Sequence, residues 1–381
     1  MQEQRLTVCF ITNYLMHHQL PFCLEMEKQL GKGFVLIETE TLSEERKKLG
    51  YRSLSDRYPF VINACDSEKK RKEALEISVE SEVAIIGSAP DSFIKERLRR
   101  NKLTFRCTER IFKHGRLDPL RWAKHTAKNL PYRNKKLYYL LNSAYAAKDF
   151  AMCGAKREKM YSWGYFPECI TYDIDDLLST KRPNSLLWAG RLLPWKHPEV
   201  AVYVAQRLKA DGYDFCLTIV GIGEIEEDIK RQVAQKQLEG YVKFTGAVPS
   251  EQVRSFMKKS EIYLFTSDQN EGWGAVMNEA MNSGCAVVAC SAAGSVPCLV
   301  TDSVNGLVFE SGDYEMLYSH VKRLLDSKEL KSRLGREAYH TITGAWNANI
   351  AALRLLELVE TLGNGGGTPF AEGVAGPAKY M

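Results

Sequence analysis

Short apolar runs alternate with stretches of helical periodicity along most of the first half of the chain. Strand-like runs cover residues 6–12, 33–39, 83–90, 103–112 and 136–143. A helix-like stretch, LPFCLEMEKQLG, follows the first run and is closed by Gly31. Strands that alternate with helices favour a parallel sheet covered on both faces. The first half therefore predicts a Rossmann-like domain.

The second half restarts this alternation with its own set of strands. Strand-like runs cover residues 185–192, 215–224, 241–249, 261–268 and 285–294. Between them lie helical stretches such as PEVAVYVAQRLKADG, and EIEEDIKRQVAQKQLEG is stopped by Gly240. Glycine commonly follows the last turn of a helix because it adopts the left-handed conformation needed there. The second half thus predicts another Rossmann-like domain.

The alternation breaks between the two halves, where aromatic residues, two prolines and an acidic cluster follow one another in WGYFPECITYDIDDLLSTKRPN. We interpret this segment as a linker. A last helical stretch, followed by a tail rich in glycine and proline, predicts a helix that crosses back to the first domain and a disordered end. The expected organisation is α/β, with a domain over 1–165, the linker over 166–184, a domain over 185–345, the helix over 346–362 and the tail over 363–381.

Composition narrows the class of protein. The chain is 45% hydrophobic and 26% charged, which is typical of a globular protein and argues against a disordered one. No apolar run approaches the roughly 20 residues that span a bilayer, and the first residues do not read as a secretory signal. We therefore expect a cytoplasmic protein. Its ten cysteines show no CxxC pair, so free thiols are favoured over disulfides or zinc.

Positive charge gathers in the stretch from Lys95 to Lys136, which holds fifteen Lys or Arg against three acidic residues. A solvated face is one interpretation. The other is a surface for anionic groups: a membrane, a lipid-linked phosphate or nucleic acid. Phe105, Trp122 and Tyr132 are interleaved with the charges, which suits a membrane interface and would also suit RNA. We expect peripheral association with the inner face of the cell membrane and no nucleic-acid partner.

Candidate chemistry lies in the loops that follow the strands of the second half, because ligands bind beyond the carboxyl ends of strands in open α/β sheets. Two cations, several glycines and two carboxylates come to this edge, and this set suits a nucleotide-diphosphate sugar. Cations offset the charge of a diphosphate, and bare backbone lets N–H groups approach it. The residues are Arg191, Lys196, Gly221, Gly223, Glu271, Gly272, Trp273, Gly274, Ala275 and Glu279.

The ordered motifs GRLLPWK, VGIGE, VKFTGAVP and SDQNEGWGAVMNEAMNSGCAVVAC resemble the donor domain of retaining glycosyltransferases of family four. These enzymes have the GT-B fold, in which two Rossmann-like domains face a central cleft. The resemblance is strong over 185–310 and looser in the first half, where the phrases look like bacterial enzymes of lipopolysaccharide, capsule or exopolysaccharide synthesis. It implies a nucleotide-sugar donor bound by the second domain and a saccharide or lipid-linked acceptor bound by the first.

The resemblance also implies a role for each matching residue. Arg191 and Lys196 would bind the donor diphosphate and stabilise the leaving group. Glu271 and Glu279 form the family's E-x7-E pair, for sugar hydroxyls and ribose respectively. Backbone amides at 272–274 would contact sugar and phosphate, and the stretch 244–250, with Phe244 and Val248, would hold the base. Trp273 stands where the family often has Phe, so we expect a reshaped sugar pocket.

Two residues of the first half are further candidates. His18 follows the first strand, and Glu109 follows LTFRCT, the first six residues of the run 103–112, so both would lie at the edge of the sheet where ligands bind. Glu109 would assist deprotonation of the acceptor or pair with a nearby Arg. His18 would touch the acceptor or the transferred sugar, or serve packing.

Other chemistries fit less well. The DID motif at 173–175 has the form of a metal-binding D-x-D but lies in the predicted linker, so we interpret it as solvated or as a helix start. Gly221 and Gly223 lack the third glycine of a dinucleotide fingerprint. No metal and no cofactor are expected. The remaining alternatives are a related sugar-nucleotide epimerase or phosphorylase, and a non-catalytic protein that binds a sugar nucleotide or RNA.

Overall fold

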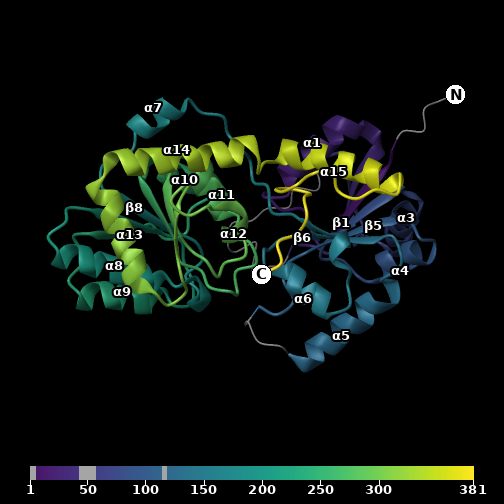
Figure 1. Ribbon diagram of the computed structural model, residues 1–381, viewed down its shortest axis with the longest axis horizontal. Helices are drawn as coiled ribbons and strands as arrows, with labels where there is room; N and C mark the ends of the chain where they lie inside the picture. The colour runs from purple at the N-terminus through teal and green to yellow at the C-terminus, as the bar shows by residue number, and fades with distance from the viewer. Residues whose placement is uncertain (1–5, 43–56, 114–117) are drawn as a thin grey trace. The chain divides into compact units, whose positions relative to one another are not determined.

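The computed structural model describes residues 6–42, 57–113 and 118–381, which fall into two compact units. The first unit holds Met1–Glu168 and Ala348–Met381, and the second holds Cys169–Asn347. Most of the segment predicted as a linker therefore belongs to the second unit. Each unit is built around its own parallel sheet (Figure 1).

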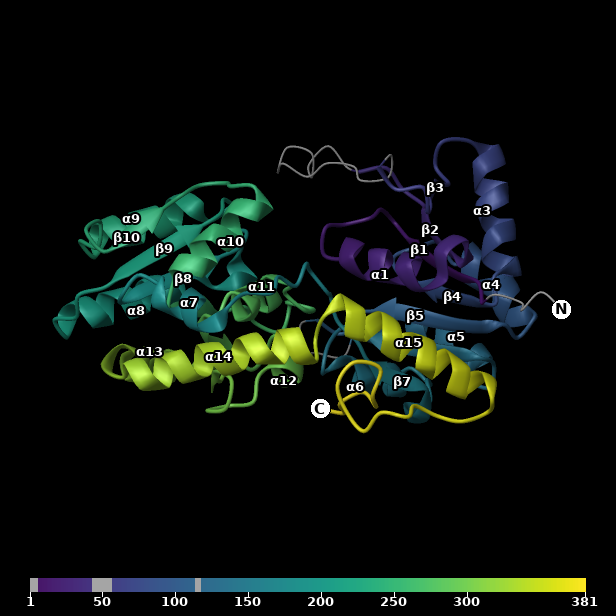
Figure 2. The same ribbon diagram turned by 90° about the horizontal axis from the view of Figure 1, so that it is seen from above.

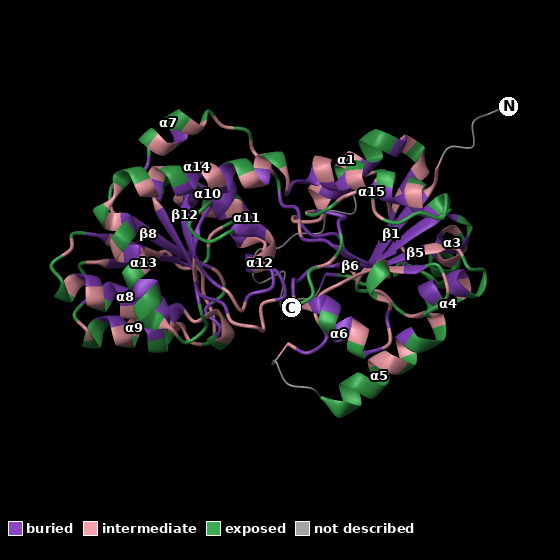
Figure 3. Ribbon diagram, in the orientation of Figure 1, coloured by how far each residue is buried: buried purple, intermediate pink, exposed green. Residues whose placement is uncertain are grey.

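The described part of the first unit forms a seven-stranded sheet in the order β3-β2-β1-β4-β5-β6-β7. All neighbouring strands run parallel. The strands are β1 (Val8–Thr12), β2 (Phe34–Glu38), β3 (Val61–Asn63), β4 (Val83–Ile86), β5 (Leu103–Thr108), β6 (Leu137–Leu141) and β7 (Met160–Ser162). The central strands are buried, as expected for a sheet with helices on both faces (Figure 3).

Helices connect these strands, and their capping follows from local sequence. Helix α5 begins at Pro119 because the Asp118 carboxylate accepts hydrogen bonds from the backbone N–H groups of Leu120 and Arg121. The helices of this unit are α1 (Leu20–Leu30), α3 (Glu68–Glu80), α4 (Ser92–Arg99), α5 (Pro119–Asn129), α6 (Ala146–Met152) and α15 (Ala348–Gly363), with short 3₁₀ turns η1 (Gly31–Gly33), η3 (Leu130–Tyr132) and η4 (Arg157–Lys159).

Helix α15 packs beside α1 although more than 300 residues separate them in the chain (Figures 1 and 2). Its buried face presents Ala351, Ala352, Leu355 and Leu358. The side-chain amide of Asn349 donates to Glu25 in α1 at 3.0 Å. The end of the chain is thus an integral part of the first unit.

The tail over 363–381, predicted to be disordered, is instead held against β7. The Ser162 N–H donates to the carbonyl of Gly376 at 2.8 Å, and the Ala375 N–H returns a bond of 2.8 Å to Ser162. The Arg354 guanidinium of α15 donates to two further tail carbonyls. The prediction of disorder was wrong because the small residues fit closely against an edge strand whose backbone groups need partners.

The second unit has a six-stranded parallel sheet in the order β10-β9-β8-β11-β12-β13. The strands are β8 (Ser185–Ala189), β9 (Cys216–Val220), β10 (Val242–Phe244), β11 (Ile262–Phe265), β12 (Ala286–Cys290) and β13 (Leu307–Phe309). The helices are α7 (Ile174–Ser179), η5 (Pro194–Lys196), α8 (Pro198–Ala210), α9 (Glu226–Gln235), α10 (Ser250–Lys259), α11 (Val276–Asn282), α12 (Val296–Leu299), α13 (Tyr314–Asp326) and α14 (Lys328–Gly344).

Both sheets reverse their strand order once, between β1 and β4 in the first unit and between β8 and β11 in the second. Loops diverge at such a point, which makes the carboxyl ends of these strands the preferred place for a ligand. None of the ten cysteines lies in a disulfide bond. Across the described ranges, no helix is both long and apolar enough to cross a bilayer.

Candidate functional site

In the second unit, two loops are fastened together at the carboxyl ends of β8 and β11. The first loop carries Lys196 and the second carries Glu271. Thr266 Oγ1 donates to the carbonyl of Lys196 at 2.6 Å, and the Asp268 N–H donates to the carbonyl of Trp195 at 3.0 Å. These bonds fix the relative position of the two backbones before any ligand arrives.

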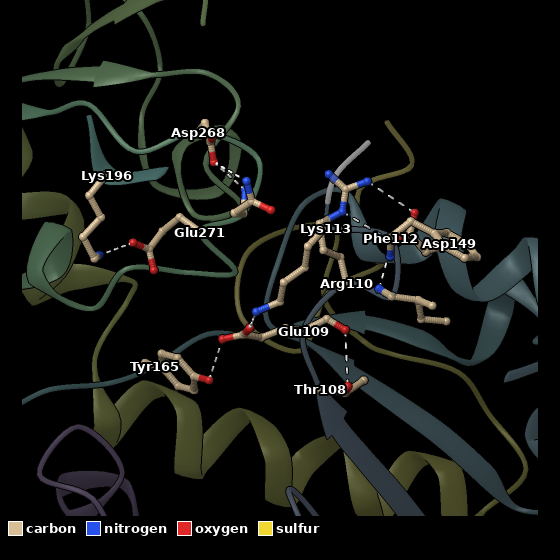
Figure 4. A network of polar contacts seen from close by, with 12 residues as sticks. Thr108, Glu109, Arg110, Phe112, Lys113, Asp149, Tyr165, Lys196, Asp268 and Glu271 are labelled. Carbon is tan, nitrogen blue, oxygen red and sulfur yellow. Dashed lines mark hydrogen bonds and ion pairs between the residues drawn. The ribbon is translucent and has the colours of Figure 1, made fainter. Parts of the chain in front are cut away.

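Lys196 and Glu271 point toward one another and form an ion pair (Figure 4). Each side chain is only 15% exposed, and Ser267 Oγ donates to the same carboxylate oxygen at 3.3 Å. The sequence predicted both residues as donor contacts, and the structure brings them together. An ammonium and a carboxylate held side by side can separate to meet an anionic and a hydroxyl group of one ligand.

Open backbone amides follow Glu271. The N–H groups of residues 272–275 donate to no group among the described residues, whereas the carbonyl of Glu271 is held by the Gly294 N–H at 3.1 Å. Such N–H groups, in the turn that leads into α11, can receive oxygens of a sugar or a phosphate. The loop therefore offers directed donors beside the ion pair.

The Trp273 side chain does not reshape a pocket, contrary to the sequence-based expectation. It is fully buried, its indole N–H donates to Asn278 Oδ1 at 2.9 Å, and its ring lies 5.5 Å from that of Trp346. The larger ring is accommodated by the interior of the unit, since a partner for its N–H is available there.

Gly221 and Gly223 have a packing role that the sequence did not reveal. A Cβ atom at Gly221 would lie 2.0 Å from the carbonyl oxygen of Gly190, and one at Gly223 would lie 2.2 Å from that of Leu192. The loops after β8 and β9 are also joined by a bond of 2.9 Å from the Leu192 N–H to the carbonyl of Ile222. The glycines thus allow the two loops to touch, and their contact with a ligand stays a prediction.

The other predicted donor residues lie in the same unit without contacting the ion pair. Glu279 sits in the first turn of α11, with its carboxylate 4.0 Å from the Arg254 guanidinium. Arg191 is exposed and has no partner among the residues described. Phe244 packs against the core, and Val248 is half-buried in the loop after β10. The ligand roles of these four stay predictions.

His197, which the sequence analysis did not single out, links the two loops through its side chain. It adopts a left-handed backbone conformation (φ 50°), and its ring nitrogens contact Glu199 at 2.7 Å and Asp268 at 3.2 Å. The pKa of His197 is raised, and the largest cause is its hydrogen bond to Glu199. Burial acts in the opposite direction, and the contact with Asp268 raises the pKa further. A histidine directly after a candidate lysine was the only signal available.

We expect the His197→Asn variant to lose stability in a pH-dependent way. Because the folded-state pKa is raised, the charged ring contributes fully below its unfolded pKa of about 6.5, and the contribution disappears as pH rises through the folded value. Asparagine tolerates the left-handed backbone but cannot become charged. The melting-temperature difference between wild type and variant, measured by calorimetry, should correspond to about 1 kcal/mol at pH 6 and shrink at pH 9. A difference that grows with pH would contradict this assignment.

The first unit contains a cavity of about 490 Å³ at the carboxyl ends of β1, β4, β5 and β6. Both residues predicted for this edge, His18 and Glu109, line it. The Glu109 carboxylate lies between Lys113 Nζ, at 2.7 Å, and the Tyr165 hydroxyl, which donates at 2.8 Å (Figure 4). Glu109 therefore pairs with a lysine rather than with an arginine.

Tyr165, which the sequence did not single out, joins the two predicted residues. Burial, followed by the neighbouring Glu109 carboxylate, raises the pKa of Tyr165, so its hydroxyl keeps the proton that it donates. The His18 ring lies 4.4 Å from the Tyr165 ring, and the His18 carbonyl accepts from the Phe166 N–H at 3.2 Å. This corner of the cavity is polar and preorganised.

No group of three or more potential metal ligands occurs within the described part of the chain. The acidic DID motif begins α7: the Asp173 carboxylate accepts from the N–H groups of Asp175 and Asp176. This confirms the interpretation of the motif as a helix start, because an N-cap aspartate satisfies amides that the helix leaves unpaired.

Comparison with known proteins now bears on these two sites. Residues 171–341 match the family described as glycosyl transferases group 1. This match covers nearly all of the second unit, Cys169–Asn347. The predicted family resemblance is confirmed for this part of the chain.

Individual relatives agree with this match. The amylovoran biosynthesis glycosyltransferase AmsK of Erwinia amylovora is 28% identical over 215 residues, 55% of this chain and 52% of AmsK. Alpha-D-kanosaminyltransferase of Streptomyces kanamyceticus is 27% identical over 192 residues, 50% of this chain and 48% of that enzyme. The chain thus spans about half the length of these curated relatives.

A solved structure extends the likeness to nearly the whole chain. The Anabaena protein HepE, in complex with UDP, covers 94% of this chain and 100% of its own, with a TM-score of 0.70 at 15% identity. This likeness, together with the two parallel sheets described above, confirms the predicted GT-B fold of two Rossmann-like units.

Proposed function

We propose that this protein is a glycosyltransferase that moves a sugar from a nucleotide-diphosphate sugar to a hydroxyl of an acceptor. The observation that carries the proposal is the Lys196–Glu271 pair, held beside open backbone amides at the strand ends of a group 1 domain. This arrangement combines positive charge, directed N–H donors and a carboxylate within one loop cluster, as a diphosphate sugar requires.

In the proposed mechanism the donor displaces Lys196 from Glu271. Lys196 and Arg191 then neutralise charge that develops on the departing nucleoside diphosphate, and the amides at 272–275 bind its oxygens or the sugar. Glu271 accepts hydrogen bonds from sugar hydroxyls and Glu279 from the ribose, while the stretch 244–250 holds the base. Because hydrogen bonds between the two loops hold the backbones of Lys196 and Asp268 in place before the donor binds, only side chains need to move as the leaving group departs.

The acceptor would bind the cavity of the first unit. Glu109 already accepts from Lys113 and Tyr165. We therefore assign it to orienting an acceptor hydroxyl, with His18 beside it. A saccharide or a lipid-linked saccharide fits the polar lining, since hydroxyl groups need directed donors and acceptors.

The relatives support the finer parts of the proposal. HepE was solved with UDP, and AmsK is named for the biosynthesis of amylovoran. We accordingly propose a hexosyltransferase of polysaccharide or glycolipid synthesis that retains the anomeric configuration, as the resemblance to family four implies. A cytoplasmic location, peripheral membrane association through residues 95–136, and the absence of a nucleic-acid partner stay predictions.

A thermal-shift screen against UDP-, GDP-, ADP- and dTDP-sugars tests the donor. A ligand that binds only the folded state raises the melting temperature, by mass action, so we expect one nucleotide class to stabilise the wild type and to stabilise Lys196→Ala by a smaller amount. If no sugar nucleotide shifts the melting temperature, the proposal fails. Analysis of the products then separates transfer to an acceptor from epimerisation or phosphorolysis.

Transfer should not depend on a divalent metal, because fixed cations and amides take the place of a metal at the diphosphate. We expect activity after EDTA treatment to stay within about twofold of the untreated enzyme. Removal of a catalytic metal would instead take away several kcal/mol of transition-state stabilisation and lower the rate far more than twofold. Complete loss with EDTA and recovery with Mn²⁺ would show that the donor diphosphate is held by a metal.

A further inference from the structure

A second cavity of the first unit lies between the end of β5 and helix α5. It has a volume of about 390 Å³, within the range of about 300–1,000 Å³ of small-molecule sites. Its rim shares Glu109 and Arg110 with the larger cavity, and α5 contributes Arg121, Lys124 and His125. The two cavities are thus neighbours within one unit, and one ligand can extend from the first into the second.

The cations of this cavity outnumber the carboxylates that contact them. Arg110 has a carboxylate partner, Asp149, at 3.4 Å, and Glu109 is taken by Lys113. Among the described residues, the Arg121 guanidinium donates only to a carbonyl oxygen, that of Ile111, at 2.9 Å.

Lys124 is exposed and, across the described residues, no carboxylate pairs with it or with Arg121. Asp118 is the first acidic residue after Glu109 along the chain. Its carboxylate accepts hydrogen bonds from the backbone N–H groups of Leu120 and Arg121 at the start of α5. Within the described part of the chain, two positive charges are therefore left without a carboxylate partner.

The surplus of positive charge also affects the pKa of the neighbouring His125 imidazole. Burial is the largest cause that lowers the pKa of His125, and the other causes are all cations: Arg106, Lys128, Arg121 and Lys124. Because burial and then the nearby cations disfavour its charged form, the ring stays neutral and adds a polar contact without adding charge.

We propose that this cavity binds a phosphate group of the acceptor, next to the hydroxyl that receives the sugar. This inference rests on the proposed function, because the ligand is an acceptor only if the protein transfers a sugar to it. A phosphate monoester carries a charge of about −1.5 to −2 near pH 7, which matches the two cations that have no carboxylate partner among the described residues. Arginine binds such a group with two parallel hydrogen bonds, and lysine binds it as a point charge. The phosphate belongs either to a free phosphosaccharide or to a lipid phosphate.

A titration with sn-glycerol 3-phosphate, with glycerol as the uncharged control, tests the cavity directly. The whole chain is used in a Lys196→Ala background, so that the donor loop does not contribute. We expect glycerol 3-phosphate to bind and glycerol not to bind. Lys124→Glu should weaken binding about tenfold or more, as expected for loss of a charge-assisted contact.

Lys128→Glu is the matched control, because it makes the same charge change on the same helix outside the cavity, where Lys128 pairs with Asp91 at 2.7 Å. We expect it to change the affinity less than about threefold. Equal losses in the two variants would show general surface attraction, and absence of binding would leave no site. Either result overturns the proposal.

Vesicles separate the two sources of phosphate. The protein is sedimented with phosphatidylcholine vesicles that contain phosphatidic acid, with and without glycerol 3-phosphate. Binding that glycerol 3-phosphate displaces and Lys124→Glu abolishes supports a lipid phosphate, whereas binding of the soluble ester alone supports a free phosphosaccharide. If neither glycerol 3-phosphate nor Lys124→Glu changes binding to the vesicles, recognition of a lipid phosphate in the cavity is overturned.

The donor screen keeps this proposal distinguishable from the proposed function. If a sugar nucleotide stabilises the protein but glycerol 3-phosphate does not bind, only the phosphate site is wrong. If glycerol 3-phosphate binds as expected but no sugar nucleotide does, the site stands as an anion site and the proposed function is wrong.

Discussion

Replacing Lys196 by alanine is expected to lower kcat for sugar transfer about 10²- to 10³-fold while the protein stays folded. Its ammonium group lies in a loop fixed by Thr266 and Asp268 and contacts Glu271, with only 15% of the side chain exposed. A fixed charge of this kind stabilises the leaving group without reorganisation, and removing one such donor typically costs about 3–4 kcal/mol. Initial rates at saturating donor and acceptor measure the loss.

Two further variants separate this role from a structural one. Glu271→Ala should also lose transfer, because sugar hydroxyls lose their acceptor, but its melting temperature should stay close to that of the wild type. Lys328→Ala removes an equally charged but exposed lysine at the start of α14 and should leave the rate unchanged. Wild-type rates in both Lys196→Ala and Glu271→Ala would refute the site.

The Gly223→Ala variant is expected to destabilise the second unit by about 3 kcal/mol. The added Cβ would lie 2.2 Å from the carbonyl oxygen of Leu192 and 2.6 Å from its carbonyl carbon. Both are backbone atoms, and hydrogen bonds from Leu192 to Ile222 and from Ile225 to Leu192 hold the two loops in contact. No side-chain rotation can relieve the overlap, so the loops must separate, at a cost typical of overpacking or greater.

Gly240→Ala provides the matched control, since a Cβ atom at Gly240 would meet nothing within 4 Å. There the smaller freedom of alanine in the unfolded chain makes the substitution neutral or slightly stabilising. Calorimetry of the full chain measures both variants. Equal melting temperatures for Gly223→Ala and wild type would mean that the contact between the loops after β8 and β9 does not hold the unit together.

The sequence correctly predicted what depends on local patterns. Apolar runs such as the one at 185–192 had to become buried parallel strands, because only a sheet covered on both faces hides them. The order of the motifs placed Lys196 and Glu271 at one edge of one sheet, since the carboxyl ends of parallel strands share an edge. The edge that carries His18 and Glu109 in the first unit followed from the same rule.

Other features needed the fold, because they depend on residues far apart in the chain. Ala375 is buried against β7 only because α15 returns the chain to the first unit, so a Gly- and Pro-rich composition could not reveal order. Trp273 is an interior residue because Asn278 and Trp346 surround it. Whether a glycine faces a ligand or a neighbouring loop cannot be read from spacing, and at Gly223 the neighbour is Leu192.

The sequence by itself thus determined two parallel-sheet units and the sheet edges that carry the polar residues, because hydrophobic periodicity and strand direction are local properties. Tertiary structure alone decided which charges are neutralised. Glu109 is engaged by Lys113 and Tyr165, whereas Lys124 has no carboxylate partner among the described residues. Charge balance depends on distances across the fold, and side-chain distances across a unit are not encoded in any single segment.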